Sequence, residues 1–487
     1  MGAHDTDIDS APDAGSNNDD SSHKNDTTDD DAASDTRTDL TQGPIWKALA
    51  VIAGPLVLGL AAILSVDLVD TYFIAKLGTQ QLAALSFIFP VAVIATGICI
   101  GLGAGAASVV SRSIGEGEDE DARTLSLHSI LLGLVIMIIV SIAGFLTIDP
   151  LFSALGASDT VLDYIRQYMR IWWISMPFLV LSIVAHNIVR SVGNSTWPSL
   201  IMAAASVLNI AATAALVFGF WIIPELGVAG AAAGTLISRV SLVWVSLWLI
   251  TSHVGMVNWH LPSLKTLIPS WIKVARVAGP AALGNMVNPF SIAIVTAILA
   301  GFSEIVVAGF GVATRVESIA TIPLLAMSAA LGPIAGQNWG ADKPDRIRQT
   351  LRLCFMLSLG WAVLLAALFW FFGEPIAQVF SSEEDVAKEA ATYLRIVPLS
   401  LFGFGVVVCA AAAFNAIDQA TRGLIYYVGR SLILYIPLAW IGSIIAKEQG
   451  IYFGIAGANA VAGLIVGAYA LWWFRDRRDD DDPMAER

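Results

Sequence analysis

The sequence has 487 residues, of which 56% are hydrophobic and only 14% are charged, and its formal net charge is −13. About a quarter of the residues in a soluble globular domain are charged, so this composition excludes the soluble enzyme classes and predicts a chain that lies mostly in lipid. The sequence has no P-loop, so we do not expect it to hydrolyse ATP. Cys99, Cys354 and Cys409 lie in apolar runs, which argues against a disulfide framework or a cysteine metal site.

Residues 1–44 are predicted to form a disordered, acidic, cytoplasmic tail. The first 40 residues hold twelve aspartates against Lys24 and Arg37, so they carry −10 of the net charge. They contain few large apolar side chains and cannot bury enough surface to offset the entropy lost on ordering. A solvating tail is one interpretation and a regulatory arm is the other. A second cytoplasmic tail is predicted over residues 476–487.

Runs of apolar residues repeat between residues 46 and 474. A helix needs about 20 such residues to cross the hydrocarbon core of a bilayer, so the runs predict about twelve spans. The predicted spans begin near residues 47, 80, 124, 162, 196, 227, 269, 305, 351, 390, 421 and 450. Lys and Arg concentrate on one side of these spans, which places both termini in the cytoplasm. The predicted fold class is an all-α, multi-pass protein of the cell membrane.

The two halves of the sequence repeat each other at a nearly constant offset. The tripeptide Ala-Gly-Pro at residues 53–55 returns 225 residues later at 278–280, and Gly115 matches Gly340 at the same offset. Further matches occur in the same order along both halves, so chance is a poor explanation. The chain is therefore predicted to be an internal duplication.

Each repeat contains six predicted helices, an even number, so both repeats insert into the membrane the same way up. We predict two parallel six-helix bundles, residues 45–252 and 267–475, joined by a cytoplasmic connector over residues 253–266. Two such bundles enclose a cleft that rocking can open to either side. This layout is typical of a secondary transporter.

Polar side chains inside the spans mark the candidate site, because ionisable groups in lipid are costly and usually face the bundle interior. Asp67 and Asp70 lie three residues apart in the first span and share one helix face. At similar predicted depth lie Asn209, Thr213 and Thr235. Their oxygens could hold Na⁺, and a carboxylate in an apolar cavity could exchange protons. The alternative for Asn and Thr is hydrogen bonding between helices.

Pro55 is a candidate hinge, because it frees a backbone carbonyl about four turns before the two carboxylates. Candidates for the cleft in the second half are polar side chains of the seventh and eighth spans, namely Arg315, Glu317, Asn285 and Asn288. The two charged residues of this set, and Arg239 of the sixth span, are expected to pair across the cleft or in structural ion pairs. Arg430 is expected to snorkel to the cytoplasmic surface.

The sequence resembles the multidrug and toxic compound extrusion (MATE) family. The resemblance rests on the segment from Asp67 to Gly78, and on Gly332 to Ala341 with the letters GPIAGQNWGA, and it covers about residues 45–475. It implies export of amphipathic, often cationic, organic compounds in exchange for H⁺ or Na⁺. Apart from this coupling ion, which we place at Asp70, no metal or cofactor is expected.

The resemblance is closer to the DinF-like branch of that family. In this branch the cation site uses an Asp of the first helix, an Asn and an Asp of the fifth, and a Thr of the sixth, positions that fall on Asp70, Asn209, Thr213 and Thr235. The fifth-helix Asp is thus a threonine here. The acidic seventh-helix position of the NorM-like branch matches Asn288. Both departures leave Asp70 as the principal candidate, with Asp67 as a substitute for the missing charge.

The alternative function is that of a lipid-linked oligosaccharide flippase of the same superfamily. Such a carrier would present a cationic cleft to pyrophosphate, whereas the first-half groups are acidic. A membrane-embedded enzyme is disfavoured by short loops and scattered histidines, and a pure channel by the duplication. The expected partners are small organic substrates and membrane lipid, with no nucleic acid, and the chain is expected to act as a monomer.

Overall fold

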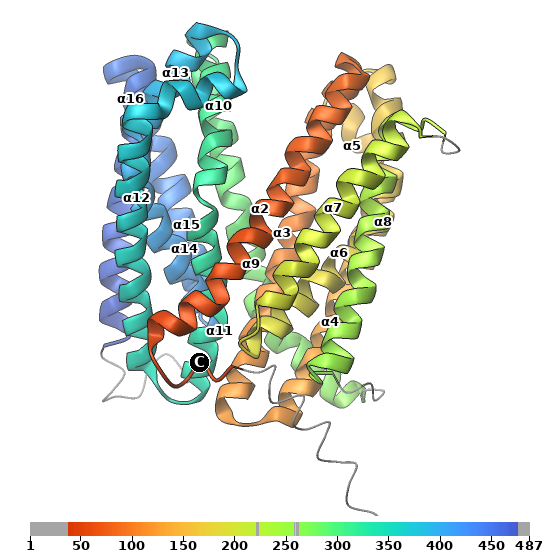
Figure 1. Cartoon of the computed structure of the whole chain (residues 1–487), viewed down its shortest axis with the longest axis vertical. Helices are drawn as coiled ribbons and strands as arrows, with labels where there is room; N and C mark the ends of the chain where they lie inside the picture. Colours follow the sequence, from red (N-terminus) through yellow and green to blue (C-terminus); the bar gives the residue numbers. More distant parts are fainter. Residues whose placement is uncertain (1–37, 221–223, 258, 260–262, 476–487) are drawn as a thin grey trace, which may run out of the picture.

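The computed structural model describes residues 38–220, 224–257, 259 and 263–475 (Figure 1). The helices in chain order are α2 (Ile45–Leu77), α3 (Thr79–Glu116), α4 (Asp119–Leu146), α5 (Ile148–Ala154), α6 (Asp159–Ser191), α7 (Thr196–Phe218), α8 (Gly227–Trp248), η1 (Leu249–His253), α9 (Leu264–Leu299), α10 (Glu304–Ala320), α11 (Ile322–Gly340), α12 (Pro344–Phe380), α13 (Glu384–Ile396), η2 (Pro398–Ser400), α14 (Leu401–Ala416), α15 (Ala420–Val428), η3 (Gly429–Tyr435) and α16 (Ile436–Trp473).

The apolar runs fold into helices because lipid offers no partners to the backbone, so each peptide group must be satisfied within its own segment. Glycine ends some of these helices. Gly117 follows α3 with a left-handed φ of 81°, and its N–H donates to the Ile114 carbonyl at 3.1 Å. This geometry satisfies a carbonyl at the end of the helix and lets the chain turn back into α4.

The described residues contain the twelve spans that the sequence predicts. Ten stretches of helix are long and apolar enough to cross a membrane, and the pair α10 and α11, bent by 43°, makes an eleventh. The longest stretch, Ala420–Trp473, holds two spans, because the chain leaves helical geometry at Ala446 and Lys447 and turns back.

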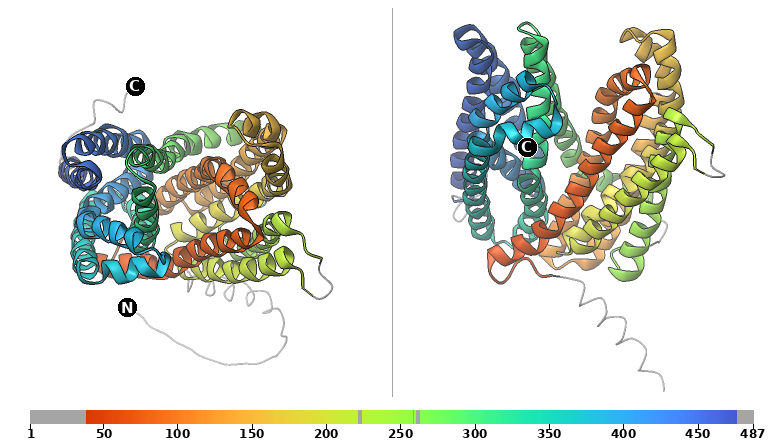
Figure 2. Two further views of the ribbon diagram at one scale, coloured as in Figure 1. Left: turned by 90° about the horizontal axis from the view of Figure 1, so that it is seen from above. Right: turned by 45° about the horizontal axis from the view of Figure 1, so that its top comes forward.

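The helices form two groups that diverge toward one end of the molecule (Figures 1 and 2). The first group holds α2 to α8 and the second holds α9 to α16. The wide end carries α5 and α13, and the narrow end carries the turns that follow α3 and α11. Buried apolar side chains form two cores, one mainly in each group. The all-α, two-lobed fold that the sequence predicts is confirmed.

At the narrow end, α3 and α11 cross with their backbones in contact. A Cβ added to Gly115 would lie 2.1 Å from the carbonyl oxygen of Gln337, and one added to Gly340 would lie 2.1 Å from that of Arg112. Gly115 matches Gly340 at the 225-residue offset, and Arg112 matches Gln337, so the two contacts are equivalent. The missing side chain of glycine is what allows two helices to approach this closely.

The first helix of each half begins in the core of the other half. Leu49 and Ile52 of α2 are buried in the core of the second group. Val274 and Ala278 of α9 are buried in the core of the first group. Farther along α2, Ile74 belongs to the core of the first group. Each of these two helices therefore passes from one group to the other (Figure 1).

The segment that precedes α2 joins the two groups at the narrow end. Leu40 is completely buried, and its backbone N–H donates to the side chain of Gln337 at 3.1 Å. The Leu40 carbonyl accepts a hydrogen bond from Asn338 at 3.0 Å. The backbone N–H of Thr38 donates to the carbonyl of Val192, just after α6, at 3.0 Å. Since α6 and α11 belong to different groups, this segment bridges them.

The disordered tail predicted over residues 1–44 is therefore too long. Residues 1–37 lie outside the described residues, as does the predicted tail over 476–487, whereas residues 38–43 form hydrogen bonds with the rest of the chain and bury Leu40. Arg346 of α12 donates to the carbonyls of Gln42 and Gly43 at 3.1 and 3.2 Å. The acidic composition of the tail did not indicate that Leu40 is buried or that the backbone around it forms hydrogen bonds with both groups of helices.

The glycine crossing gives a prediction for stability. Gly340→Ala should lower the free energy of unfolding by about 1–3 kcal/mol, the usual effect of overpacking, because the new methyl group meets the backbone of α3. The matched control is Gly332→Ala in the same helix, where a Cβ meets nothing within 4 Å. Thermal unfolding of the purified chain in detergent measures the difference. Equal unfolding temperatures for the two variants would contradict the prediction.

Candidate cation and substrate site

Three polar side chains predicted for the site meet between α7 and α8. The Asn209 amide nitrogen lies 3.5 Å from the Thr235 hydroxyl, and the Thr213 hydroxyl lies 3.5 Å from the Asn209 amide oxygen. All three side chains are buried. Gly234 brings the helices together, because a Cβ there would lie 2.7 Å from the Thr213 backbone nitrogen.

Asp70 of α2 joins this cluster. Its carboxylate interacts with the Thr213 hydroxyl. Its Oδ1 atom is buried and has no hydrogen-bond partner among the described residues. A buried carboxylate oxygen without a donor is destabilising unless a proton or a cation satisfies it. Asp67, three residues earlier on the same helix, is exposed.

The cluster fits a monovalent cation better than a transition metal. It offers oxygen atoms from one carboxylate, one amide and two hydroxyls, and oxygen ligands suit hard cations. Within the described residues, no three His, Cys, Asp or Glu side chains come close enough together to hold a metal ion. The same oxygen atoms can also surround a protonated carboxyl group.

Arg239 of α8 adds a positive charge beside this cluster. Its guanidinium donates to the Ser175 hydroxyl at 2.6 Å and lies 5.5 Å from the centre of the Trp172 ring. Asp67 and Asp70 lie near enough to attract it electrostatically. The sequence predicted an ion pair for Arg239, but among the described residues it donates to the Ser175 hydroxyl and to the Met176 sulfur. An arginine inside an apolar run was the signal for this residue, although not for its place in the site.

The backbone carbonyl that the candidate hinge Pro55 leaves without a helical donor has a hydrogen-bond partner just before α7. Pro55 has no N–H, so the carbonyl of Val51 loses its helical donor. The hydroxyl of Ser195, which is completely buried just before α7, donates to this carbonyl at 3.0 Å and also lies 2.8 Å from the carbonyl of Ile52. Ser195 therefore satisfies the carbonyl that proline frees.

A second buried polar cluster lies in the other lobe, around Arg430. This side chain is only 4% exposed, and it donates to Asn288 and Asn459 at 2.9 Å each. Its guanidinium also lies 4.8 Å from the centre of the Phe404 ring. The prediction that Arg430 snorkels to the surface is wrong. The residue lies in the π-helical turn η3, where amides and an aromatic ring in the lobe interior solvate its charge.

The other second-half candidates do not share these contacts. Glu317 accepts a hydrogen bond from the Tyr393 hydroxyl. Arg315 is exposed and forms no hydrogen bond or ion pair with the part of the chain that the structure describes. Asn285 donates to the Ala281 carbonyl of its own helix at 2.8 Å. The structure therefore joins Asn288 to the Arg430 cluster but does not join Asn285 or Arg315 to it.

The fold and its two buried polar clusters define a two-lobed helical membrane transporter. The family model named MatE matches residues 55–214 and 280–441, once in each half. The chain therefore belongs to the MATE family of transporters, and it is a multi-pass membrane protein.

Known proteins resemble the chain over nearly its whole length. The FAD transporter of Shewanella oneidensis (strain MR-1) is 35% identical over 88% of this chain and 95% of its own. The probable multidrug resistance protein YoeA of Bacillus subtilis (strain 168) is 25% identical over 88% and 94%. A mutant of the MATE transporter VcmN of Vibrio cholerae is 28% identical, has a TM-score of 0.85, and the match covers 92% and 99% of the two chains.

The Ser195 contact gives a second prediction. Ser195→Ala should lower the free energy of unfolding by about 1 kcal/mol, because the part-buried Val51 carbonyl then loses its donor. In a Pro55→Ala background the same change should have less effect, since residue 55 then supplies the missing N–H. Thermal unfolding of the four chains measures this coupling.

Ser65→Ala is the control for losing a hydroxyl group, because Ser65 lies in α2 itself. Its hydroxyl is exposed and, within the described part of the chain, bonds only to the Ala61 carbonyl of its own helix. If Ser195→Ala destabilises the protein equally with and without Pro55, the hydroxyl does not act through the freed carbonyl.

Proposed function

We propose that this chain exports organic compounds in exchange for H⁺ or Na⁺, which binds at Asp70. The observation that carries the proposal is the buried Oδ1 of Asp70, which has no partner among the described residues. The oxygen atoms of Asn209, Thr213 and Thr235 lie in the same cluster. Binding a cation there satisfies the lone oxygen and removes a net negative charge from an apolar surrounding.

The place of Asp70 on α2 links this binding to a conformational change. The helix begins in the core of the second lobe and carries Asp70 in the first, with Pro55 between the two regions. A change in charge at Asp70 alters how the upper part of α2 packs against α7. Bending at Pro55 can then alter the angle between the lobes.

The proposed substrates are amphipathic and cationic organic compounds. Asp67 is exposed near Asp70 and offers a negative charge that a neighbouring carboxylate reinforces. The resemblance to YoeA, whose name describes a probable multidrug resistance protein, supports this substrate class. The positive charge of Arg239 nearby limits how strongly the site attracts cations.

The proposal predicts that Asp70→Asn abolishes coupled efflux. An amide cannot gain or lose a proton and is a weaker ligand for Na⁺, so efflux of a cationic dye from cells should fall to the level of cells without the transporter. Asp163→Asn is the matched control, because this aspartate is 65% exposed and pairs with Arg166. Both variants should be expressed at the wild-type level. Full efflux by Asp70→Asn would remove this residue from the mechanism.

Everted membrane vesicles can identify the coupling ion. A pH gradient and a sodium gradient are each imposed alone, and dye uptake into the vesicles is followed. We expect one of the two gradients to drive uptake by the wild type and neither to drive uptake by Asp70→Asn. Uptake that needs neither gradient would contradict the proposed exchange.

A flavin dinucleotide is the second candidate substrate. The observation that favours it is the 35% identity to a protein named FAD transporter, together with one arginine inside each lobe, the half-buried Arg239 and the buried Arg430. Arginine is well suited to bind a pyrophosphate group, and rings such as Trp172 can stack on flat ring systems. Uptake of FAD into the same vesicles, lost in Asp70→Asn and unaffected by cationic dyes, would favour FAD as the substrate.

We also propose that both termini lie in the cytoplasm. The narrow end carries Arg112, Lys343 and Arg346, and the wide end carries Glu384 and Asp385 at the start of α13. Basic residues concentrate on the cytoplasmic side of membrane proteins. The described conformation then opens outward.

A further inference from the structure

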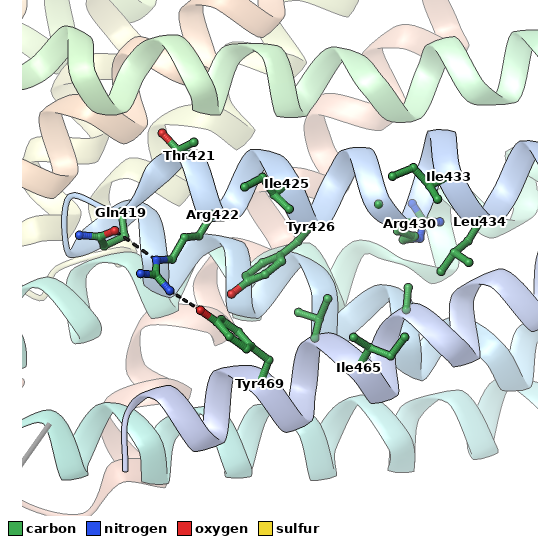
Figure 3. A pocket seen from close by; sticks show the side chains of 13 residues that line it. Gln419, Thr421, Arg422, Ile425, Tyr426, Arg430, Ile433, Leu434, Ile465 and Tyr469 are labelled. Carbon is green, nitrogen blue, oxygen red and sulfur yellow. Dashed lines mark hydrogen bonds between the residues drawn. The ribbon is translucent and has the colours of Figure 1, made fainter. Parts of the chain in front are cut away.

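A cavity of about 830 Å³ lies between α15, η3 and α16 in the second lobe (Figure 3). Three of its polar side chains, Gln419, Arg422 and Tyr469, lie at one end, and Arg430 lies at the other end beside Leu434. The apolar side chains of Ile425, Ile433 and Ile465 follow toward the other end. The residues that line it include two arginines and no aspartate or glutamate. The cavity is therefore amphipathic, with positive charge and no negative charge in its lining.

At the polar end lies the guanidinium group of Arg422, which aromatic side chains hold in place. Arg422 donates to the Gln419 side chain at 3.2 Å and to the Tyr469 hydroxyl, and it lies 5.3 Å from the centre of a Trp473 ring. Among the described residues it forms no ion pair. The nearest acid in sequence, Asp418, lies 3.8 Å from Arg276 instead.

The Tyr426 hydroxyl is a second group in this cavity that a ligand could bind. The residue is only 8% exposed and lines the cavity, and its hydroxyl is buried without a hydrogen-bond partner in the described part of the chain. Buried hydroxyl groups in native proteins almost always have a partner. A hydroxyl donor and a guanidinium without an acidic partner among the described residues together fit an anionic oxygen.

The apolar end fits a hydrocarbon chain. Ile425, Ile433 and Ile465 are 59%, 65% and 62% exposed, and they belong to membrane-spanning segments, so the cavity is open along an apolar side. From Arg422 to Ile433 the helix rises about 16 Å at 1.5 Å per residue. This length is close to one leaflet of a hydrocarbon core about 30 Å thick.

We propose that this cavity binds one anionic phospholipid. The phosphate contacts Arg422 and the Tyr426 hydroxyl near the narrow end, and an acyl chain lies along Ile425 and Ile433. Arg430 also lines the cavity, but it lies at the end away from Arg422, where Asn288 and Asn459 accept hydrogen bonds from it, so we assign the headgroup to Arg422. Basic pockets between spans on the cytoplasmic side of membrane proteins suit anionic headgroups.

The test measures lipid that stays bound to the full chain. Protein is extracted from vesicles of equal phosphatidylglycerol and phosphatidylcholine, and its bound lipid is identified by native mass spectrometry. The wild type should retain phosphatidylglycerol about fivefold over phosphatidylcholine, the ratio that about 1 kcal/mol from one basic residue gives. Arg422→Gln should remove this preference. Ile433→Trp should reduce the retention of both lipids by filling the cavity.

Arg352→Gln is the matched control, because Arg352 is an exposed arginine of α12 that lies outside the cavity. It should keep the wild-type preference. The proposal is overturned if the wild type retains both lipids equally, or if Arg352→Gln loses as much preference as Arg422→Gln. Release of the lipid by soluble glycerol phosphate or by FAD would also overturn it, since the cavity would then bind a soluble anion. None of these measurements of bound lipid depends on transport activity.

Discussion

The contact between the backbones of α3 and α11 is the constraint on which the two-lobed shape depends. Gly115 and Gly340 let these helices touch at one end of the molecule, and the lobes diverge from that contact. Because the two glycines are equivalent in the duplication, the contact lies where the two halves meet symmetrically. Any larger side chain there would separate the lobes at the end that the segment around Leu40 also joins.

The duplication has kept the backbone of the two halves but not their chemistry. At the 225-residue offset, Asn209 and Thr213 of α7 match Leu434 and Leu438. In the other direction, Arg430 matches Ala205. The first lobe therefore holds a carboxylate with amide and hydroxyl oxygens, whereas at the matching positions the second lobe has leucines and adds Arg430. The two lobes of one fold thus differ in the polar groups that they bury.

The sequence predicted the features that depend on composition and order along the chain. The spans follow from apolar length, and Asp70 is a candidate because an ionisable group inside an apolar span is costly. Three features depend on contacts between distant segments and were not predictable. Arg430 is held inside the lobe by Asn288, which lies 142 residues away, Leu40 is buried by partners about 300 residues away, and Ser195 looks like an ordinary residue before a helix.

The path of α2 explains how the proposed hinge at Pro55 and the carboxylate of Asp70 can act together. Leu49 and Ile52 anchor the start of α2 in the second lobe, while Asp70 lies in the first, so any change in the angle between the lobes must be taken up between them. Pro55 lies there, and a helix lacking one N–H bends at lower cost than an intact one. In α9, Pro280 occupies the equivalent position, but Ala420 stands where the first half has Ser195. Only the first half therefore combines a proline, a hydroxyl group that satisfies the freed carbonyl, and a carboxylate farther along the same helix.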